Sequence, residues 1–289
     1  MQELRDLARR LLEEKAVGCV VGYEEGPRGV RPAFVVDPND VDRLVFDHRS
    51  VQNLAAYLNP RRNHIKPLGK VAVVVKPCDA AAVAGLIRET QLAREDVVVI
   101  GVRCSGVAKN ADDAALDGAT LADRCIGCER REPHLADHVV GEAHEPPHAE
   151  PRREARIAEL DAMTPEQRWA FWSGELSRCI RCHACREVCP LCFCDRCLAD
   201  KTQPQWIESS PHPRGNLSWH ISRALHLAGR CVGCNECERA CPVGIPLGLL
   251  TSKVAAIVKD RFGYVSSDDP SVPAPIGTFS RDDAQEFIR

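Results

Sequence analysis

Two runs of cysteines in this sequence share one spacing, C-x-x-C-x-x-C-x-x-x-C-P. The first run ends at Pro190 and the second at Pro242. With this spacing, three thiolates of one short loop ligate three irons of a cube, and the fourth cysteine ligates the cube of the other run. We therefore expect two 4Fe-4S clusters with crossed ligands: Cys179, Cys182, Cys185 and Cys241 for cluster 1, and Cys231, Cys234, Cys237 and Cys189 for cluster 2.

Structural zinc is the alternative interpretation of the two runs. Zinc is usually held by two separated C-x-x-C pairs per ion, whereas each run here is a complete pattern of four cysteines that ends in Cys-Pro. The repeated pattern favours iron-sulphur clusters. Because crossed ligands tie two clusters into one module, the chemistry that we expect is one-electron transfer between them.

Three further cysteines follow the first run within a long insert, namely Cys192, Cys194 and Cys197. They are candidate ligands of a further cluster or of a zinc ion, with Cys19, a histidine such as His212, or a residue of a partner protein as the fourth ligand. The alternative is that they are packed or redox-buffering thiols. The sequence leaves both interpretations open.

Four upstream cysteines form another candidate group. Cys78 and Cys104 each follow a strand-like segment, and Cys125 and Cys128 form a C-x-x-C pair in the region beyond. The carboxyl ends of strands are the edge at which α/β sheets place their sites. These four thiols are therefore candidates for a third cluster, with buried cysteines or a zinc site as the alternatives.

Charged residues differ between the two runs. Arg178, Arg181 and Arg186 surround the first run, whereas Glu236 and Glu238 accompany the arginines of the second. Positive charge favours the reduced, more negative form of a cluster. The sequence thus predicts a higher reduction potential for cluster 1, unless these charges only form a solvated face.

The N-terminal part of the sequence predicts an α/β domain. An amphipathic helix over residues 3–14 precedes short valine-rich segments at 18–23, 33–37 and 43–46. Two continuous β-branched runs, 70–77 and 96–102, flank a helical segment. This is the pattern of a βαβ unit in a parallel sheet that is covered by helices.

The rest of the chain predicts a connector, a cluster module and a tail. Residues 129–155 are polar and rich in proline; helices are expected from Thr164, around 217–228 and around 247–258. We therefore expect four parts: an α/β domain with a partly parallel sheet over 1–145, a linker over 146–163, a mainly α-helical two-cluster ferredoxin domain over 164–262, and an extended tail over 263–289.

The chain resembles the coenzyme F420 hydrogenase/dehydrogenase β-subunit family, and its region 164–262 resembles bacterial ferredoxin-type modules. The residues that match the family upstream of that region are Lys76, Pro77, Cys78, Asp79, Cys104, Cys125, Cys128, Pro133, Asp137 and Gly141. The resemblance implies an α/β domain with iron-sulphur clusters and often a flavin, which makes FAD a candidate cofactor. The sequence has no G-x-G-x-x-G loop that would support FAD independently.

Composition excludes several other classes of protein. The net charge is only -3 and no block of lysine or arginine stands out, so nothing indicates nucleic-acid binding. No apolar run reaches the roughly 20 residues needed to cross a membrane. The N-terminal residues lack the pattern of a secretory signal, so we expect a cytoplasmic protein whose 16 cysteines are reduced ligands and not disulfides.

These observations predict an iron-sulphur electron-transfer subunit of an anaerobic oxidoreductase complex. The family resemblance implies hydrogenase, formate dehydrogenase or heterodisulphide-reductase-type partner subunits. One alternative is a flavin-containing catalytic subunit that reduces or oxidises a soluble carrier such as coenzyme F420 or NAD(P)H. Another is a zinc-stabilised scaffold. No pattern of residues is specific enough to name a catalytic residue.

Overall fold

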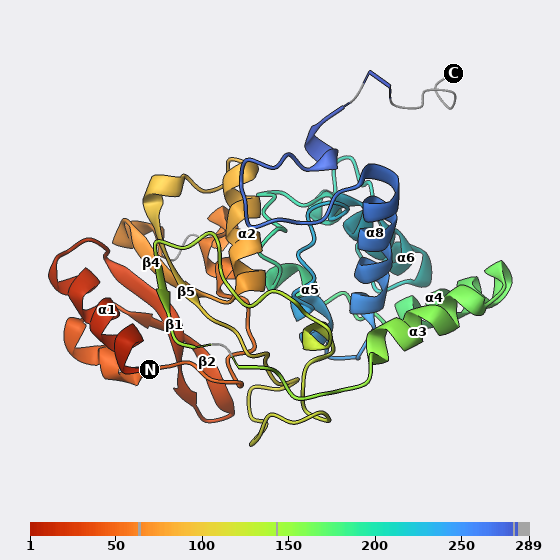
Figure 1. Cartoon of the computed structure of the whole chain (residues 1–289). Coiled ribbons are helices and arrows are strands. Elements are labelled where there is room, and N and C mark those ends of the chain that lie inside the picture. The colour runs from red at the N-terminus through yellow and green to blue at the C-terminus, as the bar shows by residue number, and fades with distance from the viewer. Residues whose placement is uncertain (63–64, 143, 280, 283–289) are drawn as a thin grey trace.

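The N-terminal half of the protein is built around a mixed β-sheet (Figure 1). The structure, a computed structural model, describes residues 1–62, 65–142, 144–279 and 281–282. Six strands in this part of the chain form one sheet: β1 (Cys19–Gly26), β2 (Gly29–Val35), β3 (Leu44–Val45), β4 (Val71–Val75), β5 (Val97–Val102) and β6 (His138–Val140). The strand order is β2-β1-β4-β5-β6, and β3 also pairs with β1.

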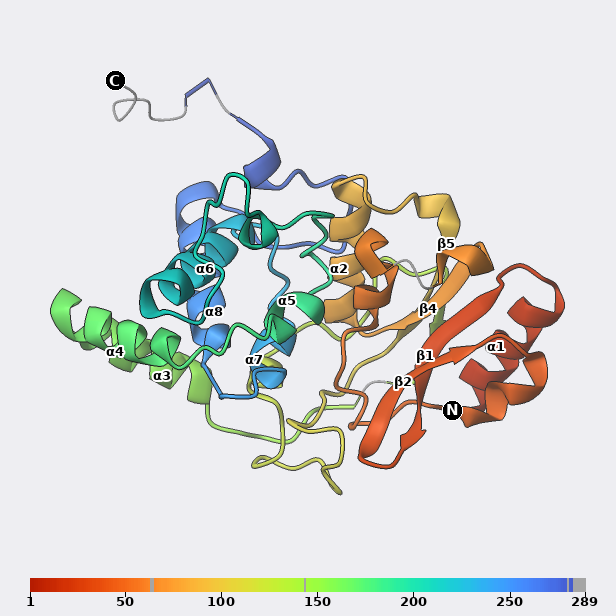
Figure 2. The same ribbon diagram turned by 180° about the vertical axis from the view of Figure 1, so that it is seen from behind.

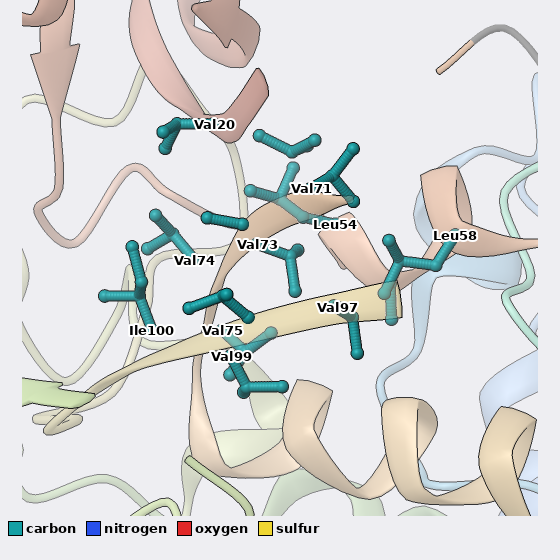
Figure 3. Close-up of a cluster of buried hydrophobic side chains, with 14 of the residues drawn as sticks. Val20, Leu54, Leu58, Val71, Val73, Val74, Val75, Val97, Val99 and Ile100 are labelled. Carbon is teal, nitrogen blue, oxygen red and sulfur yellow. The ribbon is translucent and has the colours of Figure 1, made fainter. Parts of the chain in front are cut away.

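The predicted parallel unit is present. β1, β4, β5 and β6 run parallel to one another, whereas β2 and β3 pair with β1 in the antiparallel sense. Every residue of β4 and β5 is buried, as expected for central strands covered on both faces. Their valines pack with Leu54 and Leu58 in the core of the domain (Figure 3).

Helices α1 (Gln2–Glu13) and α2 (Pro77–Arg88) lie on opposite sides of the sheet (Figures 1 and 2). α1 buries the apolar stripe that its sequence predicts: Leu4, Leu7, Ala8, Leu11 and Leu12. α2 starts at Pro77, directly after Lys76 at the end of β4. Because α2 connects β4 to β5, its first turn lies at the carboxyl edge of the sheet.

Two elements lie where the sequence predicted a connector and a linker. β6 extends the parallel sheet beside β5, but three residues carry too little alternation to stand out in a polar segment. α3 (Arg152–Ala162) occupies most of the expected linker, 146–163. α3 begins after Pro151, the last proline of the segment, and consists mostly of residues that favour helices. Its Leu160 is buried.

The C-terminal part contains helices α4 (Pro165–Ser177), α5 (Ala184–Glu187), α6 (Pro213–His226), α7 (Glu236–Arg239) and α8 (Leu247–Phe262), joined by the loops that carry the cysteine runs. α4 starts with the predicted capping box of Thr164 and Gln167. α6 contacts both α4 and α8. The short helices α5 and α7 contact each other and lie between α6 and the sheet domain (Figure 2).

The beginning of the predicted tail is anchored to the α/β domain. Arg88 of α2 donates to Tyr264 Oη at 3.1 Å and to the carbonyl of Asp269 at 2.9 Å. Short 3₁₀ helices complete the described chain at Pro38–Arg43, Leu54–Leu58, Pro60–Arg62, Lys66–Leu68, Arg94–Asp96, Asp123–Cys125, Leu198–Asp200 and Pro275–Gly277. Within the described residues, no helix has the length and apolar character required to span a bilayer.

Candidate iron-sulphur centres

The two cysteine runs adopt the same backbone conformation. Arg181 and His183 of the first run have left-handed φ angles of 58° and 59°, and Gly233 and Asn235 at the matching positions of the second run have φ angles of 73° and 59°. Non-glycine residues pay a conformational cost for this geometry, which is often found in functional loops. Each loop then enters a short helix, α5 or α7, that carries the third cysteine.

Backbone N–H groups point at sulphur atoms in these loops. The N–H of Arg181 donates to Cys179 Sγ at 3.4 Å, and the N–H of Ile245 donates to Cys241 Sγ at 3.4 Å. Such donors stabilise a negatively charged sulphur, and they are among the protein's means of tuning an iron-sulphur cluster.

Cys241 lies with the thiols of the first run. Burial raises the pKa of Cys179 and that of Cys185, and the charges of Cys182 and Cys241 raise both further. Because these charge effects fall off with distance, the four thiols are close together. We call them the first cysteine set.

Cys189 lies with the thiols of the second run. Burial raises the pKa of Cys231 and of Cys234, and it raises that of Cys237 to about 12; the charge of Cys189 acts in the same direction on all three. These four thiols form the second cysteine set. The charge of Cys185 also acts on Cys237, so these effects place the thiols of the two runs near one another without dividing them into two sets. The crossed grouping and the role of these cysteines as cluster ligands stay predictions.

The donor atoms of these sets suit iron-sulphur chemistry. Among the residues that the structure describes, no three His, Cys, Asp or Glu side chains are arranged to hold a single metal ion. Each set offers four sulphur ligands, which as thiolates select iron-sulphur clusters or zinc. Binding requires the thiols to lose their protons, so the raised pKa values describe the protein before metal enters.

The four upstream cysteines also come together. Cys78, Cys104, Cys125 and Cys128 line one cavity of about 400 Å³. Cys78 lies in the first turn of α2 and Cys104 follows β5, so both are at the carboxyl edge of the sheet. N–H groups of Gly106 and Val107 donate to the sulphurs of Cys104 and Cys125, at 3.3 and 3.5 Å. We call these four thiols the third cysteine set.

The third set adjoins the second. Val232 and Gly233, from the loop of the second run, line the same cavity. Burial lowers the pKa of Arg124, but Cys125 of the third set, Glu236 and Cys234 of the second set help to raise it above its ordinary value. Arg124 therefore lies near thiols of both sets and lines the cavity that they share.

Cationic side chains surround this cavity. Lys76 is fully buried and pairs with Asp79 Oδ2 at 2.7 Å. Arg124 and Arg153 both line the cavity, and the Arg124 side chain is 8% exposed. Nε of Arg124 and Nη2 of Arg153 have no hydrogen-bond partner. Buried N–H groups without a partner call for a bound ion or water. An anionic group in the cavity, such as a cluster held by thiolates, would satisfy them.

The insert cysteines line a separate cavity of about 60 Å³, together with His226 at the end of α6. A hydrogen bond from Cys192 lowers the pKa of Cys189 to about 6 and raises that of Cys192, which places Cys192 beside the second set. Cys19 is buried in β1, and His212 caps α6, where its Nδ1 accepts from the N–H of Arg214. Neither of those two expected fourth ligands lines this cavity, and no sequence motif pointed to His226.

The cysteine runs define the class of the C-terminal part. Residues 175–245 match the family model of the 4Fe-4S dicluster domain, and the match spans both runs. The C-terminal part of the protein is therefore a dicluster ferredoxin domain attached to an α/β domain.

Longer similarities concern dehydrogenase subunits. The chain is 23% identical to the F420-dependent formate dehydrogenase subunit beta of Methanocaldococcus jannaschii over 358 aligned positions, which cover 92% of each chain. It is 24% identical over 106 positions to F420-dependent formate dehydrogenase 1 subunit beta of Methanococcus maripaludis, covering 37% of this chain and 27% of that protein. The expected similarity to hydrogenase/dehydrogenase β subunits is confirmed.

Two shorter similarities accompany these. The succinate dehydrogenase iron-sulfur subunit of Bacillus subtilis is 32% identical over 101 positions, covering 33% of this chain and 38% of that protein. A chain in the solved structure of the F420-reducing NiFe hydrogenase complex from Methanosarcina barkeri covers 37% of this chain and 38% of that one, at 14% identity. Its TM-score of 0.31 is too low to bear on the fold.

Proposed function

We propose that this protein is an iron-sulphur electron-transfer subunit of a multi-subunit anaerobic oxidoreductase, in which it relays single electrons between partner subunits. The observation that carries the proposal is the match of residues 175–245, which contain both cysteine runs, to the 4Fe-4S dicluster domain. Similarity to β subunits of F420-dependent formate dehydrogenases along most of the chain supports the same role.

In this proposal the first and second cysteine sets hold clusters 1 and 2 within a mainly helical module, residues 164–262. When bound, such clusters accept and donate single electrons. The chain supplies the thiolates, directs N–H groups at two sulphurs of the first set and shields part of each set from bulk water. Burial of Cys185 and Cys237, each on its short helix, serves this last purpose.

We further assign a third cluster to the third cysteine set. Its support is the shared cavity, the N–H groups directed at two of its sulphurs and the unpartnered nitrogens of Arg124 and Arg153. The second-run loop lines the same cavity, which suggests the order third set, second set, first set for electron passage. The insert cysteines remain candidates for one more metal site.

The setting follows from the relatives. Two of them are named as subunits of formate dehydrogenases, so we propose formate dehydrogenase subunits as partners. Hydrogenase or heterodisulphide-reductase-type partners and a cytoplasmic location remain proposals from the sequence.

A second candidate function is that of a flavin-containing subunit acting on a soluble carrier such as coenzyme F420 or NAD(P)H. A cavity of about 270 Å³ favours it, because the ends of two parallel strands line that cavity: Val102 and Arg103 at the end of β5, and Val140 and Gly141 at the end of β6. The carboxyl edge of parallel strands is where α/β domains bind cofactors. FAD retained by the protein and turnover of such a carrier would select this function.

The test is elemental analysis of protein purified without oxygen. We expect about twelve irons and as many acid-labile sulphides per chain if all three cysteine sets are loaded, and about eight if only the dicluster domain is loaded. Cys125→Ser should remove about four irons, whereas Cys19→Ser, outside the three sets, should remove none. Zinc without iron would contradict the proposal.

A further inference from the structure

Arg223 is a buried arginine that lies among thiols. It belongs to α6 and is 5% exposed. Its Nη2 donates to the carbonyl of Cys185 at 3.0 Å, while its Nε has no hydrogen-bond partner. Among the described residues, no carboxylate lies within ion-pair distance of Arg223; by contrast, Arg124 has Glu236 at 3.9 Å.

The thiols that act on Arg223 come from both cysteine sets of the dicluster domain and from the insert. Burial lowers its pKa, but the charges of Cys189 and Cys237 from the second set, of Cys192 from the insert and of Cys185 from the first set outweigh burial and raise the pKa well above its ordinary value. The guanidinium therefore keeps its positive charge, and thiols of both sets lie near it. Arg181 is also buried, but the thiols that act on its pKa are Cys179 of the first set and Cys197 of the insert. No thiol of the second set is among the main causes of its pKa shift.

A buried cation without a carboxylate needs another source of negative charge, because its desolvation costs several kcal/mol. The neighbouring His220 adds no second positive charge, because burial lowers its pKa to about 4 and the ring is neutral at pH 7. Two clusters held by the neighbouring thiolates would supply the negative charge.

We propose that Arg223 is a counter-ion shared by clusters 1 and 2, and that it raises the reduction potentials of both together. This inference rests on the proposed function. A fixed positive charge stabilises the reduced, more negative form of a cluster. When an electron passes between the clusters, one is oxidised by one electron and the other is reduced by one; Arg223 keeps its proton and stabilises either location. The difference between the two potentials, and so the driving force of the step, depends little on Arg223.

The test is a redox titration followed by EPR on the whole protein, with Arg223→Gln, Arg223→Lys and Arg214→Gln. Arg214 is the matched control, because it is an exposed arginine on the same helix. In Arg223→Gln, we expect the ratio of reduced to oxidised cluster at a fixed potential to fall about tenfold for both clusters, which is 59 mV for a one-electron couple. Arg223→Lys and Arg214→Gln should change neither ratio by more than about threefold, which is half that shift on a logarithmic scale.

The variants separate charge from structure. A shift confined to one cluster, or no shift in Arg223→Gln, overturns the proposal. If Arg223→Gln fails to retain iron, the test falls to Arg223→Lys, which keeps the positive charge but not the planar set of hydrogen-bond donors. A tenfold change in the ratio of reduced to oxidised cluster in Arg223→Lys, for either cluster, also overturns the proposal. Wild-type protein without iron would refute the proposed function itself, whereas iron-loaded wild type with unchanged potentials in Arg223→Gln refutes only the role of Arg223.

Discussion

Removal of Cys241 tests the crossing of ligands between the two runs. Cys241 belongs to the second run by sequence, yet its charge acts on Cys179 and Cys185 of the first. A serine hydroxyl replaces a soft thiolate with a poor ligand for iron, so Cys241→Ser should lose cluster 1 and keep cluster 2. Because each set has four thiols and each cluster four irons, the loss amounts to about four irons per chain, half the content of the dicluster domain.

EPR spectra of four variants identify which cluster is lost. Cys182→Ser removes a ligand that belongs to cluster 1 under any assignment, and Cys234→Ser does the same for cluster 2. Cys241→Ser should lack the same reduced signal as Cys182→Ser, and Cys189→Ser the same signal as Cys234→Ser. If Cys241→Ser matches Cys234→Ser, each run holds its own cluster and the crossed arrangement is wrong.

Three other predictions concern the fold that positions the sets. Lys76→Met removes the cation that lies 2.7 Å from the buried Asp79 carboxylate. It should lower the free energy of unfolding, measured with urea under anaerobic conditions, by about 3–5 kcal/mol. A decrease of less than about 1 kcal/mol would contradict a role of the ion pair in stability. Burial raises the pKa of Glu24, but Arg43 and Arg31, each donating at 2.9 Å, hold it below its ordinary value. The ionised Glu24 therefore stabilises the fold above its unfolded pKa of about 4.5, and this stabilisation is lost as the pH falls through the lower folded pKa. Glu24→Gln should lower the midpoint of urea unfolding more at pH 7 than at pH 3. Equal effects at the two pH values would contradict this linkage. Arg88→Ala removes the bonds to Tyr264 and Asp269, and should make residues 264–274 more sensitive to limited proteolysis without changing the iron content; an unchanged digestion pattern would show that other contacts hold this segment.

The core of the α/β domain could be predicted because its signals are local and strong. The valine runs of β4 and β5 are buried on both faces, and α1 buries one continuous stripe, so their patterns are visible in short windows. β6 and α3 were missed because β6 owes its place to pairing with β5, and because α3 follows a proline-rich segment that dominates the local composition.

The cysteine spacing predicted the dicluster domain, because each run itself determines the geometry of its loop. The residues around those thiols could not be predicted in the same way. Arg223 and His226 face the sets only through the placement of α6, which depends on its contacts with α4 and α8. The sequence shows the charged residues next to the first run, but it does not show their surroundings. In the structure Arg186 pairs with Asp200 at 2.6 Å, whereas Arg181 is buried.

EPR of the dithionite-reduced protein, purified without oxygen, tests the central claim most directly. The proposal predicts at least two reduced 4Fe-4S signals that interact, since the crossed ligands keep clusters 1 and 2 adjacent. A protein that contains zinc, remains colourless and gives no signal on reduction would contradict the claim that the two cysteine sets form an electron relay.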